Sequence, residues 1–419
     1  MRTVLTTLFV LALAACERTP EPPSTAARPP APTPRAPLRV AAWPLPATAA
    51  AQPDLVAAPD GTLLLSWIEK TDAGHSMRFA RHDGRIWSTV RTIATGRDWF
   101  VNWADTPHIA ATPDGALWAH WLRKSAAATY AYDVVLSRSG DGGATWSAPV
   151  RVNDDGTPTE HGFVSLWPAA RDRLGVAWLD GRETAGAHGG HGGHGGGAMT
   201  LRSATFDATL ARHGESQLDA STCDCCQTDV VVADGTPVLV YRDRAPGEIR
   251  DIVATRFTGG QWTPPRAVHA DRWNMPACPV NGPSAAARGR EVVVGWYTVA
   301  DEVARVKLAR SVDGGDRFAG TLVVDEGPAV LGRVAVAHHG GQAWIAWLRE
   351  AAGRQSLWLA RIAADGSRIE ERLRIADLQG RGRATGVPQL VSRDDGLRLV
   401  WTDLVDGAPR LQGAVIATR

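Results

Sequence analysis

The sequence predicts an all-β chain built from seven similar repeats. Each repeat has an apolar strand, a turn that contains glycine, and a second strand that ends in an aromatic residue; "PDLVAAPDGTLLLSW" is the first copy. The closing aromatics, spaced 51 to 63 residues apart, are Trp67, Trp121, Trp178, Tyr241, Trp296, Trp347 and Trp401. The 17 Trp, 43 Gly and 27 Pro, with few long helical patterns, favour strands and turns. This period indicates a β-propeller with seven four-stranded blades.

The two ends of the repeat region predict how the ring closes. The last repeat has only three strands, "PQLVS", "LRLVW" and "RLQGAVIAT". The segment "LRVAAW", residues 38–43, precedes the first repeat, and we predict that it supplies the missing fourth strand. Pairing of the two ends would remove two exposed sheet edges. We therefore expect residues 38–419 to form one closed propeller.

The N-terminal segment resembles the leader of bacterial lipoproteins. Arg2 precedes a short apolar run, residues 4–15, which fits a signal peptide and is too short for a membrane anchor. Leu13-Ala14-Ala15-Cys16 is similar to a lipobox, which implies that residues 1–15 are removed and Cys16 is lipidated. Residues 16–37 then form a Pro-rich tether. The resemblance implies a bacterial cell envelope location, periplasmic or outer-membrane, with the lipid as the only membrane contact.

Two turns give the repeats a family resemblance. "SGDGGATW", residues 139–146, matches the Asp-box pattern, and "SVDGGDRF", residues 311–318, matches it with Arg at the Thr position. These turns resemble those of the sialidase superfamily, which implies an Asp-box (BNR-repeat) propeller and possible exo-alpha-sialidase-like hydrolysis. Sialidases have six blades, so a six-bladed ring is the alternative to seven. No Arg-Ile-Pro signature occurs near the first strand, and Asp-box propellers also include binding and assembly proteins.

The alternation of strands places most of the unusual residues on one face. Loops that lead into the first strand of each blade share that face with loops between the second and third strands, and the Asp-box turns lie opposite. Scaffold-borne loops of this kind commonly bind ligands. Candidate ligand-binding residues in these loops are Trp99, Asn102, Asp105, Asp243 and Asn281.

A group of charged residues on this face suggests recognition of an acidic glycan. Retaining sialidases clamp a carboxylate with arginines and use a tyrosine nucleophile and an aspartic acid. The loosely matching residues here are Tyr297, Asp180, Arg182, Arg242, Arg244 and Arg250. The competing interpretation is that these arginines and the neighbouring carboxylates pair with one another and tie the blades together.

The cysteines form a second candidate site on the same face. Cys223, Cys225 and Cys226 lead into the fourth blade, and Cys278 leads into the fifth. Disulfides are one interpretation, because an exported chain meets oxidising conditions. A thiolate site for copper or another transition metal is another, and a redox pair is a third. His188, His191 and His194, in the Gly-rich insert of the third blade, could collect such a metal.

Three functions follow from these patterns. The first is binding, and possible hydrolysis, of an acidic glycan or small-molecule ligand. The second is periplasmic copper handling, and the third is a non-enzymatic scaffold for another envelope protein. The net charge of +1 argues against nucleic acid as a partner.

Overall fold

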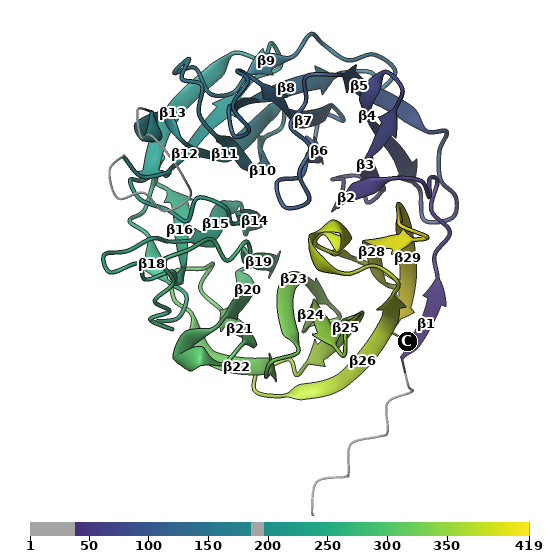
Figure 1. The fold of residues 1–419 in the computed structure, drawn as a ribbon, viewed down its shortest axis with the longest axis vertical. Coiled ribbons are helices and arrows are strands. Elements are labelled where there is room, and N and C mark those ends of the chain that lie inside the picture. The colour runs from purple at the N-terminus through teal and green to yellow at the C-terminus, as the bar shows by residue number, and fades with distance from the viewer. Residues whose placement is uncertain (1–37, 186–196, 419) are drawn as a thin grey trace, which may run out of the picture. The chain divides into compact units, whose positions relative to one another are not determined.

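A computed structural model of the chain describes residues 38–185 and 197–418. They form seven antiparallel sheets that are arranged as blades around a central channel (Figure 1). The prediction of a seven-bladed β-propeller is therefore confirmed, and the six-bladed alternative is wrong. In the described part of the chain, helices are confined to single short turns, none of which is long and apolar enough to cross a membrane.

The strands of each blade follow one another outward from the channel. Blade one consists of β2 (Ala51–Ala57), β3 (Leu63–Thr71), β4 (Gly74–His82) and β5 (Arg91–Gly96). Blade two consists of β6 (Ile109–Ala111), β7 (Leu117–Lys124), β8 (Tyr132–Ser139) and β9 (Val150–Arg151). Blade three consists of β10 (His161–Ala170), β11 (Arg173–Asp180), β12 (Thr200–Phe206) and β13 (Arg212–Asp219). Blades four and five consist of β14 (Asp229–Ala233), β15 (Thr236–Arg242), β16 (Ile252–Thr258), β17 (Gln261–Trp262) and β18 (Arg266–Ala267); and β19 (Ser284–Arg288), β20 (Glu291–Thr298), β21 (Arg305–Ser311) and β22 (Ala319–Glu326). Blades six and seven consist of β23 (Val330–His339), β24 (Gln342–Ala351), β25 (Arg354–Ile362) and β26 (Ile369–Leu378); and β27 (Gln389–Arg393), β28 (Gly396–Val405), β29 (Ala408–Ala417) and β1 (Arg39–Ala42). Three 3₁₀ turns lie in the connecting loops: η1 (Arg182–Thr184), η2 (Ala300–Glu302) and η3 (Gly382–Thr385).

The ring closes in the predicted way, with a strand from the N-terminal side of the propeller. Strand β1 pairs antiparallel with β29, in a register that places Arg39 opposite Ala417 (Figure 1). It therefore becomes the outermost strand of the seventh blade. Leu38–Arg419 forms one compact unit. The predicted leader, Cys16 and the tether lie outside the described residues.

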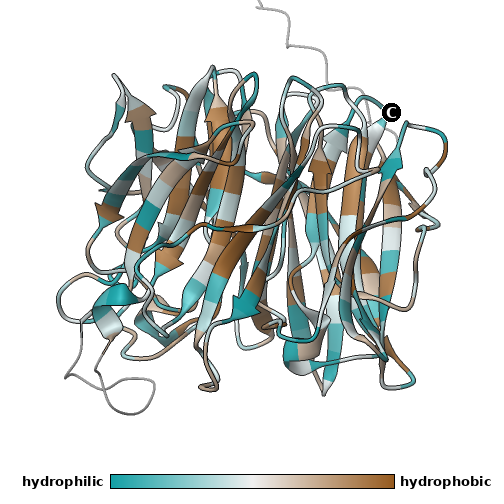
Figure 2. Cartoon of the chain, turned by 90° about the horizontal axis from the view of Figure 1, so that it is seen from above, coloured by the Kyte–Doolittle hydropathy of each residue, from teal (hydrophilic) through white to brown (hydrophobic). Residues whose placement is uncertain are grey.

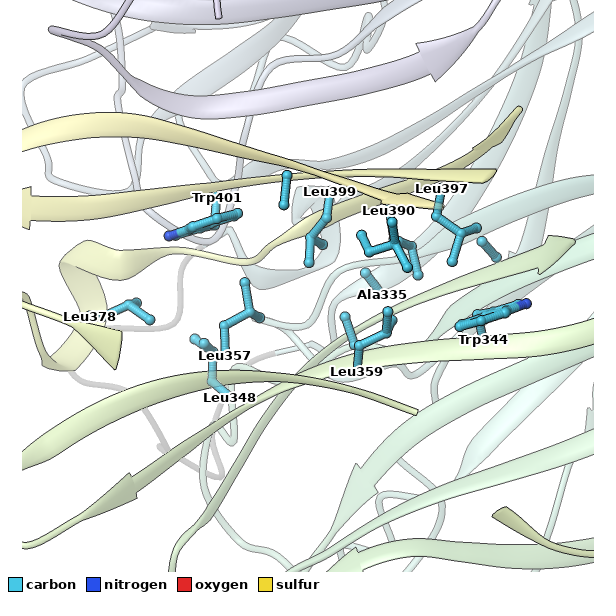
Figure 3. Packing of buried hydrophobic residues seen from close by; sticks show 14 residues of the cluster. Ala335, Trp344, Leu348, Leu357, Leu359, Leu378, Leu390, Leu397, Leu399 and Trp401 are labelled. Carbon is cyan, nitrogen blue, oxygen red and sulfur yellow. The ribbon is translucent and has the colours of Figure 1, made fainter. Parts of the chain in front are cut away.

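Neighbouring blades pack through apolar side chains that alternate along the strands (Figure 2). Between blades six and seven, Leu397 and Leu399 of β28 meet Leu357 and Leu359 of β25 (Figure 3). All four are at most 1% exposed. Because both faces of each sheet are covered by neighbouring blades, the core is a continuous ring rather than a single central cluster.

The seven closing aromatics lie in this ring, between 0% and 7% exposed. Several also donate a hydrogen bond to a carboxylate. Tyr241 donates from its hydroxyl to Asp219 at 2.7 Å, in the same way that the Trp347 indole donates to Asp325 at 2.7 Å. Buried indole and phenol groups need such partners. Tyr241 is thus a packing residue, as the repeat alignment predicted.

The two Asp-box-like turns are held by their own side chains. In the first, Asp141 accepts a hydrogen bond from the backbone N–H of Thr145 at 2.9 Å, and Ser139 accepts one from Gly143 at 2.8 Å. A Cβ on Gly143 would lie 2.2 Å from the ring of Phe79 in the preceding blade. The turn therefore needs glycine for a close contact between blades, and its aspartate has a structural role.

Polar side chains near the channel join each inner strand to the next blade. The Asp54 carboxylate accepts the backbone N–H of Ile109 at 2.8 Å, and Asp229 accepts that of Ala285 at 2.8 Å. Ser284 accepts the N–H of Val336 at 3.1 Å. Asp229 and Ser284 begin their inner strands and Asp54 lies within β2, and these groups fix neighbouring blades to one another.

Candidate functional site

The four cysteines of the two predicted loops come together on one face of the ring. Cys223, Cys225 and Cys226 lie between β13 and β14, and Cys278 lies between β18 and β19. The sulfur of Cys223 is 3.0 Å from that of Cys226 and 3.9 Å from that of Cys225. The Cys278 thiol hydrogen-bonds with that of Cys225. We call these four residues the cysteine cluster; none of them is disulfide-bonded in the structure.

The cysteine cluster has a buried half and an accessible half. Cys223 and Cys226 are 1% and 2% exposed, whereas Cys225 and Cys278 are partly exposed. The backbone holds the buried half in place, because the N–H of Cys223 donates to the carbonyl of Arg242 at 3.1 Å. Thr222 also forms an isolated β-bridge with Asp243. The three sulfurs of Cys223, Cys225 and Cys226 all lie within 4.8 Å of one another.

The electrostatics of the cysteine cluster favour one thiolate. Burial opposes ionisation of Cys226, but hydrogen bonds from the Cys223 and Cys225 thiols and the nearby Arg242 charge hold the pKa of Cys226 well below its usual range. Burial raises the pKa of Cys223 to about 12. The arrangement is a thiolate on Cys226 that accepts hydrogen bonds from neighbouring thiols.

Arg242 is a buried cation beside this thiolate. Its side chain is 2% exposed, and its Nε and Nη2 donate to the carbonyl of Asn281 at 3.1 and 2.7 Å. Its Nη2 also donates to the carbonyl of Tyr297 at 2.7 Å, and its guanidinium lies 4.9 Å from the ring of Trp273. Within the described residues, no aspartate or glutamate lies at ion-pair distance from it. Its charge acts on the thiols of Cys223 and Cys226, where it favours ionisation.

The other predicted arginines are engaged with carboxylates. Arg250, 3% exposed in its side chain, pairs with Glu248 at 2.7 Å and with Asp224 at 3.3 Å. Arg244 pairs with the same Glu248 at 2.8 Å. Arg182 makes a bidentate pair with Asp180 at 2.8 Å through both Nε and Nη2. These contacts show the pairing of arginines with carboxylates that the competing interpretation assumed, but each pair lies within one blade or the loop that leads into it.

The Asp180 carboxylate also contacts buried side chains inside blade three. It accepts the indole N–H of Trp178 at 2.7 Å and lies 3.6 Å from His161 Nε2. His161 in turn lies 3.0 Å from Asp155. Asp155, His161 and Asp180 lie close enough to share a metal ion, but Arg182 already occupies both carboxylate oxygens of Asp180. We therefore describe this group as an ion-pair network.

Tyr297, the predicted nucleophile, lies near the cysteine cluster without a carboxylate partner. Its ring packs edge-to-face on Trp273 at 6.0 Å, and burial raises the pKa of its hydroxyl. In the described chain, no hydrogen bond joins that hydroxyl to an aspartate or glutamate. Its role as a nucleophile stays a prediction.

The five predicted ligand-binding residues have structural contacts. Trp99 is 8% exposed and packs on Trp121, with ring centroids 5.5 Å apart. In each of the other four, a side-chain oxygen accepts a backbone N–H. Asn102 accepts that of Ala104 at 2.9 Å, Asp105 that of Phe163 at 2.7 Å, Asp243 that of Arg244 at 2.7 Å, and Asn281 that of Arg333 at 2.6 Å. Asp105 and Asn281 join adjacent blades. These side chains therefore hold the loops and join blades, and their role in binding a ligand stays a prediction.

Sequence reasoning named Asp105 but missed Tyr132 and Glu160, which form a buried hydrogen-bonded group with it beside blade three. The hydroxyl of Tyr132 lies 2.7 Å from Glu160 and 3.2 Å from Asp105. Burial raises the pKa of Glu160 to about 8 and that of Asp105 to about 7. Each acid stands shortly before the inner strand of a blade, "WADTPH" and "TEHGF". An acid in the loop that leads into an inner strand is the signal that could have found Glu160.

The predicted histidine ligands His188, His191 and His194 lie outside the described residues, as does the predicted lipidation site Cys16. The described part of the site therefore consists of the cysteine cluster, Arg242 and the paired charges around them.

Comparisons with known proteins assign no family to the chain. No family model matches the chain, and no curated protein matches it. Among solved structures, an ulvan lyase of a polysaccharide lyase family has a TM-score of 0.48 at 12% identity, covering 75% of this chain and 79% of its own. The NanB sialidase from Streptococcus pneumoniae has a TM-score of 0.46 at 11% identity, covering 88% and 68%. An alpha-l-arabinofuranosidase from Fusarium graminearum has a TM-score of 0.44 at 12% identity, covering 88% and 93%. These values transfer no site residue to this chain.

Proposed function

We propose that the protein binds a soft transition-metal ion, Cu(I), through the cysteine cluster. One observation carries the proposal: sulfurs from two neighbouring blades converge beside Arg242, a fully buried cation that has no carboxylate partner within the described residues. Soft thiolate ligands select Cu(I) among the metals available to a cell. A thiolate–copper group would also supply the negative charge that Arg242 lacks.

The charge of Arg242 favours thiolates over disulfides. Two disulfides would make the cysteine cluster neutral and leave the guanidinium with only carbonyl oxygens and the Trp273 ring. An uncompensated buried charge costs several kcal/mol. One Cu(I) held by two thiolates carries a net charge of about −1, which balances one arginine.

The geometry favours Cu(I) over Zn(II). Structural zinc usually takes four ligands in a tetrahedron, with Zn–S bonds of about 2.3 Å. Of the four cysteines, Cys223, Cys225 and Cys226 form a mutually close group, and Cys278 touches that group through Cys225. Three close sulfurs suit a low-coordinate ion. Met199 lies in the same apolar cluster as Cys225, which adds a soft thioether to the surroundings.

The test is a Cu(I) titration of the full chain, purified without oxygen, against a chromophoric chelator. We expect one Cu(I) per chain, and a loss of affinity of about a hundredfold or more in Cys226→Ser, because a hydroxyl is a poor ligand for Cu(I). The Cys16→Ser variant removes the fifth cysteine and should leave the stoichiometry unchanged. Two intact disulfides by thiol counting, with no bound copper, would refute the metal site.

The predicted envelope location is compatible with copper handling, and we propose it on the lipobox-like sequence alone. Lipidation would attach the propeller to a membrane through Cys16. Incorporation of labelled palmitate into the wild-type chain, and its absence in Cys16→Ser, is the expected result. Equal labelling of both chains would contradict it.

Hydrolysis of an acidic glycan is the competing candidate. A clamp for a carboxylate needs unpaired guanidinium groups, whereas Arg182, Arg244 and Arg250 are bound to Asp180 and Glu248. We therefore expect no turnover of a fluorogenic sialoside by the wild-type chain. Turnover that is lost in Tyr297→Phe and kept in the exposed control Tyr130→Phe would establish the hydrolase instead.

A further inference from the structure

An uncharged pocket of about 250 Å³ lies between the first and seventh blades, on the face that carries the loops into the inner strands. Its walls come from the residues that lead into blades one, two and seven, and from the end of β28; Pro53, Trp103, Thr106, Val387, Thr402 and Leu404 are among them. None of its lining residues is an aspartate, glutamate, histidine, lysine or arginine. A charged ligand would lose its hydration here without gaining a partner, so the pocket selects a neutral one.

The polar side chains around the pocket are engaged outside it. Gln52 donates from Nε2 to the carbonyl of Asn102 at 2.7 Å, and its Oε1 is buried. Arg333, on β23, does not line the pocket, and its Nη1 donates to the hydroxyl of Thr385 at 2.9 Å and to the carbonyl of Gly386 at 3.2 Å. These hydrogen bonds hold the loops that lead into blades two and seven, so the apolar walls are preformed.

Trp103 is the aromatic wall of the pocket, and its ring is held in place. It is partly exposed, and the Arg333 guanidinium lies 4.6 Å from its ring centroid. Because Arg333 does not line the pocket, this contact leaves another part of the indole to face the pocket. The N–H of Ala104 donates to the Asn102 side chain at 2.9 Å, which fixes the backbone on both sides of Trp103. A fixed indole offers a flat apolar surface for an aromatic ring.

Two hydroxyl groups in the walls are left for a ligand. No hydrogen bond joins the hydroxyl of Thr106 or that of Thr402 to a described residue, and neither oxygen is enclosed. Thr402 is the deeper of the two, at 2% exposure. It lies on the same side of β28 as Val400, which packs against Leu65 of the first blade. A hydroxyl can accept or donate a hydrogen bond, so the pocket has one polar point in an apolar setting.

We propose that this pocket binds a small neutral aromatic molecule with one hydrogen-bonding group, of the size and polarity of indole. An apolar cavity of about 150 Å³ holds benzene, so a volume of about 250 Å³ has room for about ten non-hydrogen atoms, or two fused rings. The rings pack on Trp103, and the hydrogen-bonding group reaches Thr402. The site is independent of the proposed copper site, because none of its lining residues belongs to the cysteine cluster.

The test is isothermal titration of the full chain with indole, for which we expect one saturable site with a Kd below about 1 mM. Indole-3-carboxylate and tryptamine carry charges of opposite sign, and each should bind about tenfold more weakly or worse. Indole-3-carboxamide is neutral and matches the carboxylate in size, so it should bind more tightly than the carboxylate does. No saturable binding up to about 5 mM indole, or equal affinity for either charged compound, overturns the proposal.

Two variants test the two contacts. Trp103→Leu keeps an apolar wall without the aromatic face, and it should weaken indole binding about twofold to tenfold. Thr402→Val keeps the shape and removes the hydroxyl, so it should weaken indole binding by a similar factor and leave the binding of toluene, which has no hydrogen-bonding group, unchanged.

The matched control is Trp146→Leu, which replaces a partly exposed tryptophan of an Asp-box turn on the opposite face and should bind indole as the wild type does. Thermal melting checks that each variant folds. Unchanged indole binding by a folded Trp103→Leu chain, or an equal loss for indole and toluene in Thr402→Val, also overturns the proposal.

Discussion

Replacing Arg242 by methionine is expected to destabilise the fold by about 3–5 kcal/mol and to weaken Cu(I) binding by tenfold or more. The substitution keeps most of the side-chain length but removes the charge and the donors that satisfy the carbonyls of Asn281 and Tyr297. Buried carbonyls left unpaired each cost about 1–3 kcal/mol. It also removes the positive charge that favours ionisation of Cys226. Urea denaturation measures the first effect, and chelator competition measures the second.

The matched control is Arg244→Met, in the same loop region. Arg244 is 25% exposed in its side chain and pairs with Glu248, so its loss should cost less than about 1 kcal/mol. Copper affinity should change little, since Arg244 is paired with Glu248. If Arg242→Met were as stable as Arg244→Met and held copper equally well, the role of Arg242 as a charge partner would be wrong.

The Glu160→Gln variant is expected to change how stability depends on pH. Burial, together with the neighbouring Asp105 and Asp224, raises the pKa of Glu160 to about 8 against the opposing hydrogen bond from Tyr132. A carboxyl whose pKa is higher in the folded chain than in the unfolded chain holds its proton in the fold. The contribution of this bound proton to the free energy of unfolding is complete below about pH 4 and is lost as the pH rises through about 8. The wild-type chain should therefore lose stability from neutral to alkaline pH, and glutamine should abolish that part of the loss.

The expected difference between Glu160→Gln and wild type is on the order of 4–5 kcal/mol in favour of the variant at pH 9, and about 1 kcal/mol or less at pH 5. Free energies of unfolding from urea titrations at several pH values provide the measurement. Glu183→Gln, at an exposed position of η1, is the control and should follow the wild-type curve. A Glu160→Gln curve parallel to that of the wild type would show that the carboxyl is ionised in the fold throughout.

The architecture was predictable because its signals repeat. Each closing aromatic is a large buried residue at a fixed place in its blade, so seven copies reveal the period even where a single strand is ambiguous. The closure by residues 38–43 followed from counting strands, and β1 occupies that place. The convergence of Cys278 with Cys225 followed from topology, because loops of adjacent blades share a face.

Partner choice within the charged loops was not predictable in the same way. Arg242 and Arg244 are two residues apart, yet the first binds carbonyl oxygens and the second binds Glu248. The choice depends on burial and on loop paths that no short sequence pattern specifies. One further signal was available in the sequence. Asp54 follows Pro53 and Ser284 follows Pro283 at the same position of their repeats, and each of these polar side chains accepts a backbone N–H of the next blade.

The pairing of β1 with β29 also has a consequence for the order of events during folding. The partners Arg39 and Ala417 are separated by nearly the whole chain, so the contact that completes the ring is the most non-local one in the domain. Non-local pairings form late and slowly, because the entropy of closing the loop is lost before the contact is gained. Until β29 is made, β1 has no partner strand. The closed ring, and the fixed spacing of its face loops, can therefore arise only after the last strand of the chain is available to pair.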